Sequence, residues 1–389
     1  MNPVYLDNAA TTPVSQAVLD KMLPYFRERY GNASSIYGTG RDARKAIDAA
    51  RRQAAQALNA KPNEIYFTAG GSESDNWAIK GAAFMQRKKG KHIITTAIEH
   101  HAVLHTCQWL EKQGFSVTYL PVDEFGLVTA DQVEKAVTDE TILISVMAAN
   151  NEIGTLEPIS EISRIAREHK ILFHTDAVQA LGAVPVDVES WGVDLMSLSA
   201  HKFHGPKGVG LLYIRNGVRL DSILHGGAQE RAKRAGTENL AGIVGMAEAL
   251  DLAVAHREEN AARMSSLRDR LIKGIMDRIP DVRLNGHPTL RLPGNANVSV
   301  RYIEGEAMLL RLDLVGVAAS SGSACTSGSL DPSHVLLAIG LPHEIAHGSL
   351  RFSFSDENQE SDVDAVLEVL PGIVQTLRDM SPIYHRKEA

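Results

Sequence analysis

The sequence predicts an α/β fold in which a mostly parallel sheet forms a large domain and a smaller α+β domain follows. Between about residues 63 and 215, apolar and β-branched runs alternate with helical periods. This alternation is typical of a parallel sheet covered on both faces. The chain of 389 residues is longer than one ordinary core supports. Length alone leaves open two domains or one large α/β domain with an appendage.

Seven short apolar runs are expected to be the strands of the large sheet. Strands of a parallel sheet are apolar throughout because both of their faces are buried. The runs cover residues 65–68, 93–96, 117–120, 142–146, 171–174, 195–198 and 209–214, and helical periods at 72–86, 102–112, 130–137 and 159–169 separate the first five of them.

The C-terminal part of the chain has a different pattern. Residues 237–280 are strongly helical, and shorter elements follow Pro293. A mixture of strands and helices without regular alternation predicts a smaller α+β domain. Strands are expected at 296–300, 317–320 and 350–354, and helices at 306–314 and 362–378.

Composition and charge restrict the class of protein. Apolar residues make up 44% of the chain and charged residues 22%, as in a soluble globular protein. A net charge of −7 argues against a general binder of nucleic acid or anionic membranes. The first residues lack a signal-peptide pattern, no apolar run reaches the ~18 residues of a membrane span, and two cysteines make no disulfide framework. We therefore expect a cytoplasmic protein without nucleic-acid or membrane partners.

Polar residues gather where the predicted strands end. Ligands of an open parallel sheet bind outside the carboxyl ends of its strands, so the functional site is expected at this edge. The segments concerned are residues 70–72, 99–101, 150–152, 175–179 and 199–202.

Lys202 and Asp176 together indicate pyridoxal phosphate (PLP). Lys202 follows an apolar strand, where a lysine can lose its proton and form a Schiff base with an aldehyde. Asp176 ends another apolar run, and a buried carboxylate needs a partner. Taken singly, Lys202 would be a solvated strand end and Asp176 a helix N-cap. PLP needs both groups, a lysine for its aldehyde and an acid opposite its ring nitrogen.

Three other positions each have a functional and an ordinary interpretation. Gly70-Gly71-Ser72 lies between a strand and a helix, which suits a phosphate and equally suits a tight turn. His100 can stack on an aromatic cofactor or transfer protons, although a single histidine at a strand end is more often a hydrogen-bonded loop residue. Arg351 is either an exposed strand residue or a bidentate clamp for a carboxylate.

Cys325 lies in a run of small residues from Ser320 to Ser329. A structural cysteine is buried like a small hydrophobe, whereas Gly/Ser-rich segments are typically solvated. The sequence therefore predicts an accessible, nucleophilic thiol at Cys325. The other cysteine, Cys107, belongs to a helical stretch and is expected in the core.

Ordered matches along almost the whole chain resemble the PLP-dependent cysteine desulfurases of the NifS/IscS family. Residues 302–307 and the tail near Ser381 and Pro382 are more similar to the NifS branch. The stretches that carry the resemblance are residues 5–12, 31–35, 145–147, 150–152, 174–179, 199–202, 234–239 and 321–330.

The resemblance implies a fold, a domain division and a cofactor. The fold is that of the PLP-dependent transferases of fold type I, which is aspartate aminotransferase-like. Residues 15–255 would form the large PLP-binding domain with a seven-stranded sheet. Residues 1–14 and 256–389 would form the small domain that carries the Cys325 loop.

The resemblance also implies roles for individual residues. The expected catalytic residues are Cys325, Lys202 and His100. The expected cofactor-binding residues are Gly71, Ser72, His100, Asn151, Asp176, Gln179, Ser199, His201, Lys202 and, reaching in from the second subunit of a homodimer, Thr237. The expected substrate-binding residues are Asn8, Asn151 and Arg351.

The implied reaction converts L-cysteine to L-alanine and leaves the sulfur as a persulfide on Cys325, for use in iron–sulfur cluster assembly. Thiolate is the form of Cys325 that would attack the substrate sulfur, and a persulfide is a reversible modification of a thiol. The implied partners are a second copy of the chain and a scaffold protein of the NifU/IscU type. No intrinsic metal is expected, and Cys325 would contact metal only in a nascent iron–sulfur cluster.

Other functions stay open from the sequence. A selenocysteine lyase or an aminotransferase on the same fold would not strictly need Cys325. A non-catalytic scaffold or sulfur carrier could keep the fold, although an intact Lys202, Asp176 and His100 argue against it. The physiological pathway, in which nitrogen fixation is one candidate, is also left open.

Overall fold

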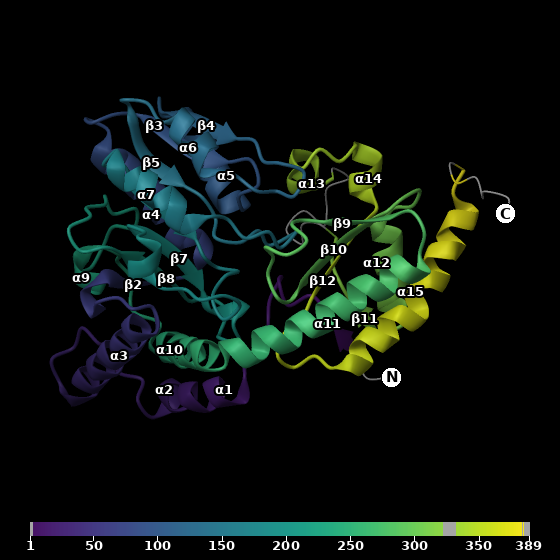
Figure 1. The fold of residues 1–389 in the computed structure, drawn as a ribbon. Coiled ribbons are helices and arrows are strands. Elements are labelled where there is room, and N and C mark those ends of the chain that lie inside the picture. Colours follow the sequence, from purple (N-terminus) through teal and green to yellow (C-terminus); the bar gives the residue numbers. More distant parts are fainter. Residues whose placement is uncertain (1–2, 322–331, 383, 385–389) are drawn as a thin grey trace.

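A seven-stranded sheet organises residues 65–214 of the computed structural model, which describes residues 3–321, 332–382 and 384 (Figure 1). The strand order is β2-β8-β7-β6-β5-β3-β4. β8 is antiparallel to both of its neighbours, and the other pairs are parallel. The prediction of a mostly parallel sheet is therefore confirmed. The strands are β2 (Ile65–Thr68), β3 (His92–Thr96), β4 (Ser116–Leu120), β5 (Thr141–Ser145), β6 (Leu172–Asp176), β7 (Leu195–Ser199) and β8 (Gly210–Ile214).

Successive residues of the same strand enter two different cores. Ile144 and Met196 pack into the core on one face of the sheet, whereas their neighbours Leu143 and Leu195 pack into the core on the other. Side chains of a strand alternate between its faces, so burial of both faces requires the continuous apolar runs seen in the sequence. Cys107 is fully buried in the second core, as expected. The first core includes helices α3 (Gly38–Ala57), α6 (Ala130–Ala136), α7 (Ile159–Glu168) and α10 (Leu240–Ala255), and the second includes α4 (Gly71–Gln86) and α5 (His101–Glu111).

A three-stranded antiparallel sheet follows in the C-terminal part, in the order β12-β10-β9. Figure 1 shows the long helices α11 and α15 side by side. They pack closely, because a Cβ at Gly274 of α11 would come within 2.4 Å of Leu367 of α15. The boundaries of the two predicted domains stay a prediction. The elements are α11 (Arg257–Arg278), β9 (Val282–Asn285), β10 (Asn295–Val300), α12 (Gly305–Leu314), β12 (Ser349–Ser353) and α15 (Glu360–Met380).

The strand expected at 317–320 is shorter than predicted and does not belong to the three-stranded sheet. β11 (Val317–Ala318) pairs in parallel with β1 (Val4–Tyr5) and forms a separate two-stranded sheet. This pairing fixes the chain just before residues 7–15, which pass along the edge of the large sheet. No helix among the described residues has both the length and the apolar character to span a bilayer. The remaining helices are α1 (Gln16–Met22), α2 (Pro24–Arg27), α8 (Val188–Trp191), α9 (Gln229–Ala232), α13 (His334–Ala338) and α14 (His343–His347), with 3-10 turns at Pro62–Glu64 and Ala200–Lys202.

A buried ion pair joins α9 to α3 beside the edge strand β2. Glu230, Arg231 and Ala232 have left-handed backbone angles, with φ of 45°, 58° and 59°, which non-glycine residues seldom adopt. The Glu230 carboxylate accepts two hydrogen bonds from Arg51, at 2.8 and 2.6 Å, and one from the N–H of Phe67 at 3.0 Å. These contacts offset the cost of the unusual backbone.

Loss of the Glu230 charge should destabilise the fold. Glu230→Gln leaves the buried guanidinium of Arg51 without its counter-charge, and we expect the free energy of unfolding to fall by about 3 kcal/mol in urea denaturation. The control is Asp42→Asn, which breaks the exposed Asp42–Lys45 pair and should cost less than about 1 kcal/mol. Equal losses in the two variants would contradict the importance of the buried pair.

Candidate active site

The carboxyl ends of the large-sheet strands open into a cavity of about 310 Å³. Every strand of this sheet except β8 runs in the same direction, so the residues that follow them meet at this edge. Residues that the sequence singled out from distant segments meet there. The predicted site residues that line the cavity are Gly71, Ser72, His100, Asn151, Asp176, Gln179, Ser199, His201, Lys202 and Arg351.

Two predicted site residues, Asn8 and Thr237, do not line this cavity, and a third, Cys325, is not among the described residues. Asn8 lines a neighbouring cavity of about 300 Å³, and its side-chain N–H2 donates to the carbonyl of Ser353 (2.8 Å) and to Asn358 Oδ1 (3.2 Å). Thr237 is exposed, on the segment that follows α9. Cys325 belongs to residues 322–331, which lie outside the described residues.

Lys202 reaches the cavity from the 3-10 turn that follows β7. Its Nζ donates to the backbone carbonyls of Ala9 (2.6 Å) and Ala10 (2.7 Å). The Ala9 carbonyl also accepts from Gln179 Nε2 at 2.9 Å. The N-terminal segment therefore forms part of the site through its backbone, which no side-chain pattern in the sequence could reveal.

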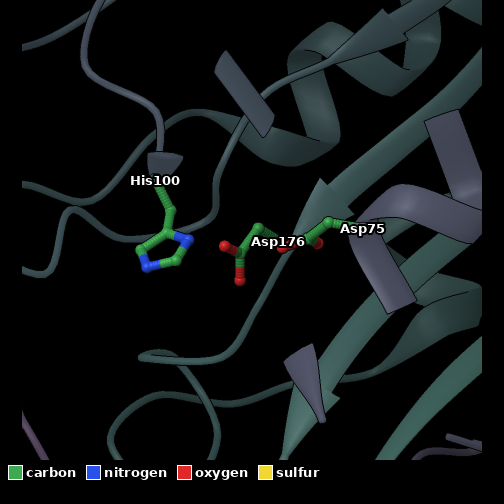
Figure 2. Close-up of side chains that lie close together, drawn as sticks. All are labelled: Asp75, His100 and Asp176. Atoms are coloured by element: carbon green, nitrogen blue, oxygen red, sulfur yellow. The ribbon is translucent and has the colours of Figure 1, made fainter. Parts of the chain in front are cut away.

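Asp176 is the last residue of β6 and is 6% exposed. Burial raises the pKa of its carboxyl to about 6, although the N–H of Val178 and the charge of Lys202 oppose the rise. Val178 donates to Oδ1 at 2.9 Å. His100 and Asp75 lie beside this carboxylate, and Figure 2 shows the three side chains together. Each offers a nitrogen or oxygen atom, and these atoms all lie within 4.8 Å of one another.

His100 caps the N-terminus of α5 and holds its ring at the cavity. Its Nδ1 accepts a hydrogen bond from the N–H of Ala102 at 3.1 Å, so Nε2 carries the proton of the neutral ring. Burial, followed by the charge of Lys202, lowers the pKa of His100 to about 4. The imidazole is therefore neutral near pH 7, which suits both stacking and proton transfer.

The first turn of α4 forms one end of the cavity. A Cβ on Gly71 would lie 2.9 Å from Val178 Cγ2 and 3.4 Å from Ser199 Cβ, so a side chain there would crowd the cavity wall. Exposed N–H groups at the start of a helix favour an anion. Near this end, His201 Nδ1 lies 3.1 Å from Thr11 Oγ1. Burial and the charge of Lys202 lower the pKa of His201 to about 4.

Arg351 is a buried cation, 1% exposed, so its interpretation as an exposed strand residue is wrong. Its guanidinium donates to the carbonyl of Asn151 (3.0 Å) and to Asp7 Oδ1 (2.8 Å). Arg351 Nε is buried and has no hydrogen-bond partner within the part of the chain that the structure describes. A carboxylate ligand could accept from it. The contact with Asp7 was not anticipated from the sequence.

These groups fit PLP. An amine, a buried carboxylate, a neutral imidazole and a helix N-terminus line one cavity, which is the donor set for the aldehyde, ring nitrogen, ring face and phosphate of this cofactor. The fold and cavity thus define a PLP-dependent enzyme on a mostly parallel α/β sheet.

Comparisons with known proteins identify the family. The family model described as Aminotransferase class-V matches residues 4–366. A "Cysteine desulfurase IscS" from Methanosarcina thermophila is 62% identical over 380 residues, which cover 98% of this chain and 94% of that protein. The solved structure titled "NIFS-LIKE PROTEIN" has a TM-score of 0.91 at 41% identity and covers 96% of this chain and 100% of its own. Another, titled "SspA in complex with cysteine", has a TM-score of 0.80 at 38% identity, with 91% and 99% covered.

The chain belongs to the class-V aminotransferases and, within them, to the PLP-dependent cysteine desulfurases of the NifS/IscS family. The predicted fold, cofactor and family are therefore confirmed. Both IscS and NifS names occur among the relatives, and assignment to the NifS branch stays a prediction.

An ion pair next to the site joins the turn after Lys202 to the loop after β12. His204 Nε2 lies 2.9 Å from Asp356 Oδ1. Burial opposes a charge on His204, but Asp356 outweighs it and raises the pKa of the imidazole above its usual value. The same contact lowers the pKa of Asp356.

The stability that this pair contributes should depend on pH. Because the pKa of His204 is raised, the pair contributes fully to the free energy of unfolding below about pH 6.5. This contribution is lost as pH rises through the folded-state pKa. The lowered pKa of Asp356 gives a contribution that is lost only when pH falls below about 4. We expect His204→Asn, which tolerates the local φ of 61°, to lower the urea midpoint at pH 5.5 and to change it little at pH 9. A difference that is the same at both pH values would contradict this assignment, and Asp356→Asn should reproduce the pattern.

Proposed function

We propose that this chain is a cysteine desulfurase that converts L-cysteine to L-alanine and receives the sulfur as a persulfide on Cys325, for iron–sulfur cluster assembly. The convergence of Lys202, Asp176 and a buried Arg351 on one cavity carries the proposal. A relative named cysteine desulfurase at 62% identity and a structural neighbour bound to cysteine support it.

The two ends of the cavity would hold the cofactor. PLP supplies, when bound, an electron-withdrawing ring to which the amino group of the substrate is joined. Asp176, as the anion, would keep a proton on the ring nitrogen, and His100 would stack on the ring. Gln179 donates to the same Ala9 carbonyl as Lys202, and it would contact the ring hydroxyl. The phosphate would be bound by the residues at the other end, Gly71, Ser72, Ser199 and His201.

Lys202 and Arg351 would act on the substrate. The Lys202 amine would hold the cofactor at rest and, once released, move the proton of the substrate Cα; the carbonyls of Ala9 and Ala10 give its Nζ a fixed position nearby. Asn151 and Arg351 would bind the substrate carboxylate, with Arg351 Nε as an additional donor. Asn8 would contribute to this end of the site only after its side chain has left Ser353.

Cys325 would accept the sulfur. Its thiolate forms a bond to the sulfur of the substrate while the bond between that sulfur and Cβ breaks. Cβ takes the electron pair of the broken bond and then a proton, which completes the alanine skeleton. The acceptor thus becomes a persulfide, and neutral His100 would carry the proton.

Replacement of Cys325 should separate sulfur transfer from cofactor binding. We expect Cys325→Ala to keep the visible absorbance of bound PLP and to reduce alanine formation and protein persulfide to background. Cys107→Ala is the matched control, because burial raises the pKa of the Cys107 thiol to about 12 and keeps it protonated. Unchanged alanine formation by Cys325→Ala would contradict the persulfide role. Turnover of selenocysteine alone would favour a selenocysteine lyase.

We also propose a homodimer in which Thr237 reaches the phosphate end of the other subunit's cavity. Thr237 is exposed and next to Glu238, which pairs with Arg44 of α3 at 3.4 Å. Ahead of α3, Tyr30, Ile36 and Tyr37 expose 69%, 89% and 60% of their surface. Exposed apolar side chains in such number are typical of an interaction surface.

A shared site can be tested by mixing two inactive variants. Thr237→Asp should repel the phosphate of PLP, and Lys202→Ala removes the reactive amine. After denaturation and refolding together, a mixed dimer has one site with an intact Lys202 and an intact Thr237. We expect activity to reappear in the mixture, up to about one quarter of wild type if subunits pair at random, and to be absent from either variant alone. No recovery despite mixed-dimer formation by mass spectrometry would contradict the shared site.

The remaining features of the proposal concern the cell. We propose a cytoplasmic protein whose sulfur acceptor is a scaffold of the NifU/IscU type, with nitrogen fixation as one pathway that it could serve. The two cysteines and the net charge of −7 support a cytoplasmic setting.

We further propose a division into two domains. One consists of residues 15–255, and the other consists of residues 1–14 together with residues 256–389.

A further inference from the structure

Asp75 is a second buried carboxyl group at the cavity, and the roles proposed above do not use it. It lies in α4, is 1% exposed and lines the cavity. One of its oxygen atoms lies within 4.8 Å of an oxygen of Asp176. In Figure 2 the Asp176 carboxylate lies between Asp75 and His100. Two acidic groups are therefore buried side by side at the place proposed for the ring nitrogen.

The surroundings of Asp75 do not favour a charge on it. Asp75 Oδ1 is buried without a hydrogen-bond partner among the described residues, and it lies 3.6 Å from His174 Nε2. Burial lowers the pKa of His174 to about 3, so this ring is neutral and provides no counter-charge. The two ring nitrogens of His174 already contact Ser145 Oγ at 2.8 Å and Ser197 Oγ at 3.0 Å.

The surroundings of Asp176 favour a charge by comparison. Val178 donates a hydrogen bond to it, and Lys202 lies near enough to stabilise the anion. Burial and then the charge of Asp176 raise the pKa of Asp75 well above its usual value. Two adjacent carboxylates in a site of low dielectric cannot both be charged without a large cost. Ser197 donates a hydrogen bond that lowers the pKa of Asp75, and the charge of Glu99 raises it. Among the described residues, Asp75 has no counterpart of the Lys202 charge that stabilises Asp176. The proton therefore belongs on Asp75.

We propose that Asp75 and Asp176 share one proton, and that Asp75 is a positioning residue that keeps this proton so that Asp176 is the charged member facing the cofactor. If Asp176 cannot be charged, Asp75 loses its proton to solvent and takes over the negative charge. The inference rests on the proposed function only for the identity of the cofactor.

A double-mutant cycle on the PLP-bound protein tests the shared proton. Asp75→Asn imitates a protonated carboxyl, so we expect its kcat to stay within about threefold of wild type. In Asp176→Asn the neighbouring charge is gone, and the cationic ring of the bound cofactor, left without Asp176, favours ionisation of Asp75 in its place. Adding Asp75→Asn to the Asp176→Asn variant should therefore lower kcat by a factor at least about ten times larger than Asp75→Asn does in wild type. A coupling of this size is typical of residues in contact.

Spectra provide readouts that a purely structural residue would not change. In Asp176→Asn, the visible absorbance of PLP should show a pH-dependent step from Asp75, and the double variant should lack it. The infrared spectrum of the wild-type holoprotein should contain the C=O stretch of a protonated carboxyl that is absent from Asp75→Asn. The same band should be lost in Asp176→Asn near neutral pH, a comparison that does not depend on the folding of Asp75→Asn.

Three results would overturn the proposal. One is an additive cycle, in which loss of Asp75 costs the same factor in both backgrounds. Another is the absence of the Asp75 carboxyl band from the wild-type spectrum, which would show that both groups are charged. The third is a stoichiometric metal ion in the purified holoprotein that is lost in Asp75→Asn, since a cation would then replace the proton. If the spectra match those predicted for the shared proton but no alanine forms from cysteine, the proposed function is contradicted, whereas the shared proton between Asp75 and Asp176 is supported.

Discussion

The burial of acidic side chains at the carboxyl edge of the large sheet is the constraint on which the site depends. Asp75, Glu99 and Asp176 are at most 6% exposed there. Burial raises the pKa of Glu99 to about 8, even though Met147 and Thr96 donate hydrogen bonds to it. A buried carboxylate requires a hydrogen-bond donor, a cation or a proton. The charge of Lys202 and the N–H of Val178 meet this requirement for Asp176, and the cationic ring of a bound cofactor would do so as well.

The N-terminal segment connects this edge to the C-terminal part of the chain. β1 pairs with β11, and from there Asp7 reaches Arg351 while the carbonyls of Ala9 and Ala10 reach Lys202. The groups proposed to bind the substrate carboxylate and to move its proton are therefore both contacted by one short stretch of chain, through the Asp7 side chain and the carbonyls of Ala9 and Ala10.

The sequence was sufficient to predict a strand or a site residue where one local property, such as burial, determines its position. The run at 65–68 became β2 because burial on both faces demands apolar residues throughout, and Asp176 stood out as an acid at the end of such a run. Strand direction was not predictable, since periodicity is the same in either direction, and so the antiparallel β8 was missed. Asp75 falls within a helical period, where an acidic residue resembles a solvated face. Ala9 and Ala10 act through backbone carbonyls and have no distinctive side chain.

The histidines of the site show how the same burial sets the charge of the cavity. Burial is the largest cause of the lowered pKa values of His100, His174 and His201, which are about 4, 3 and 4. All three are therefore neutral across the physiological range of pH. The charges of Lys202, Arg351 and Asp176 then line the cavity, and Arg351 is paired with Asp7. The neutral imidazole of His100 would therefore be left to stack and to pass protons rather than to bind the carboxylate of a substrate.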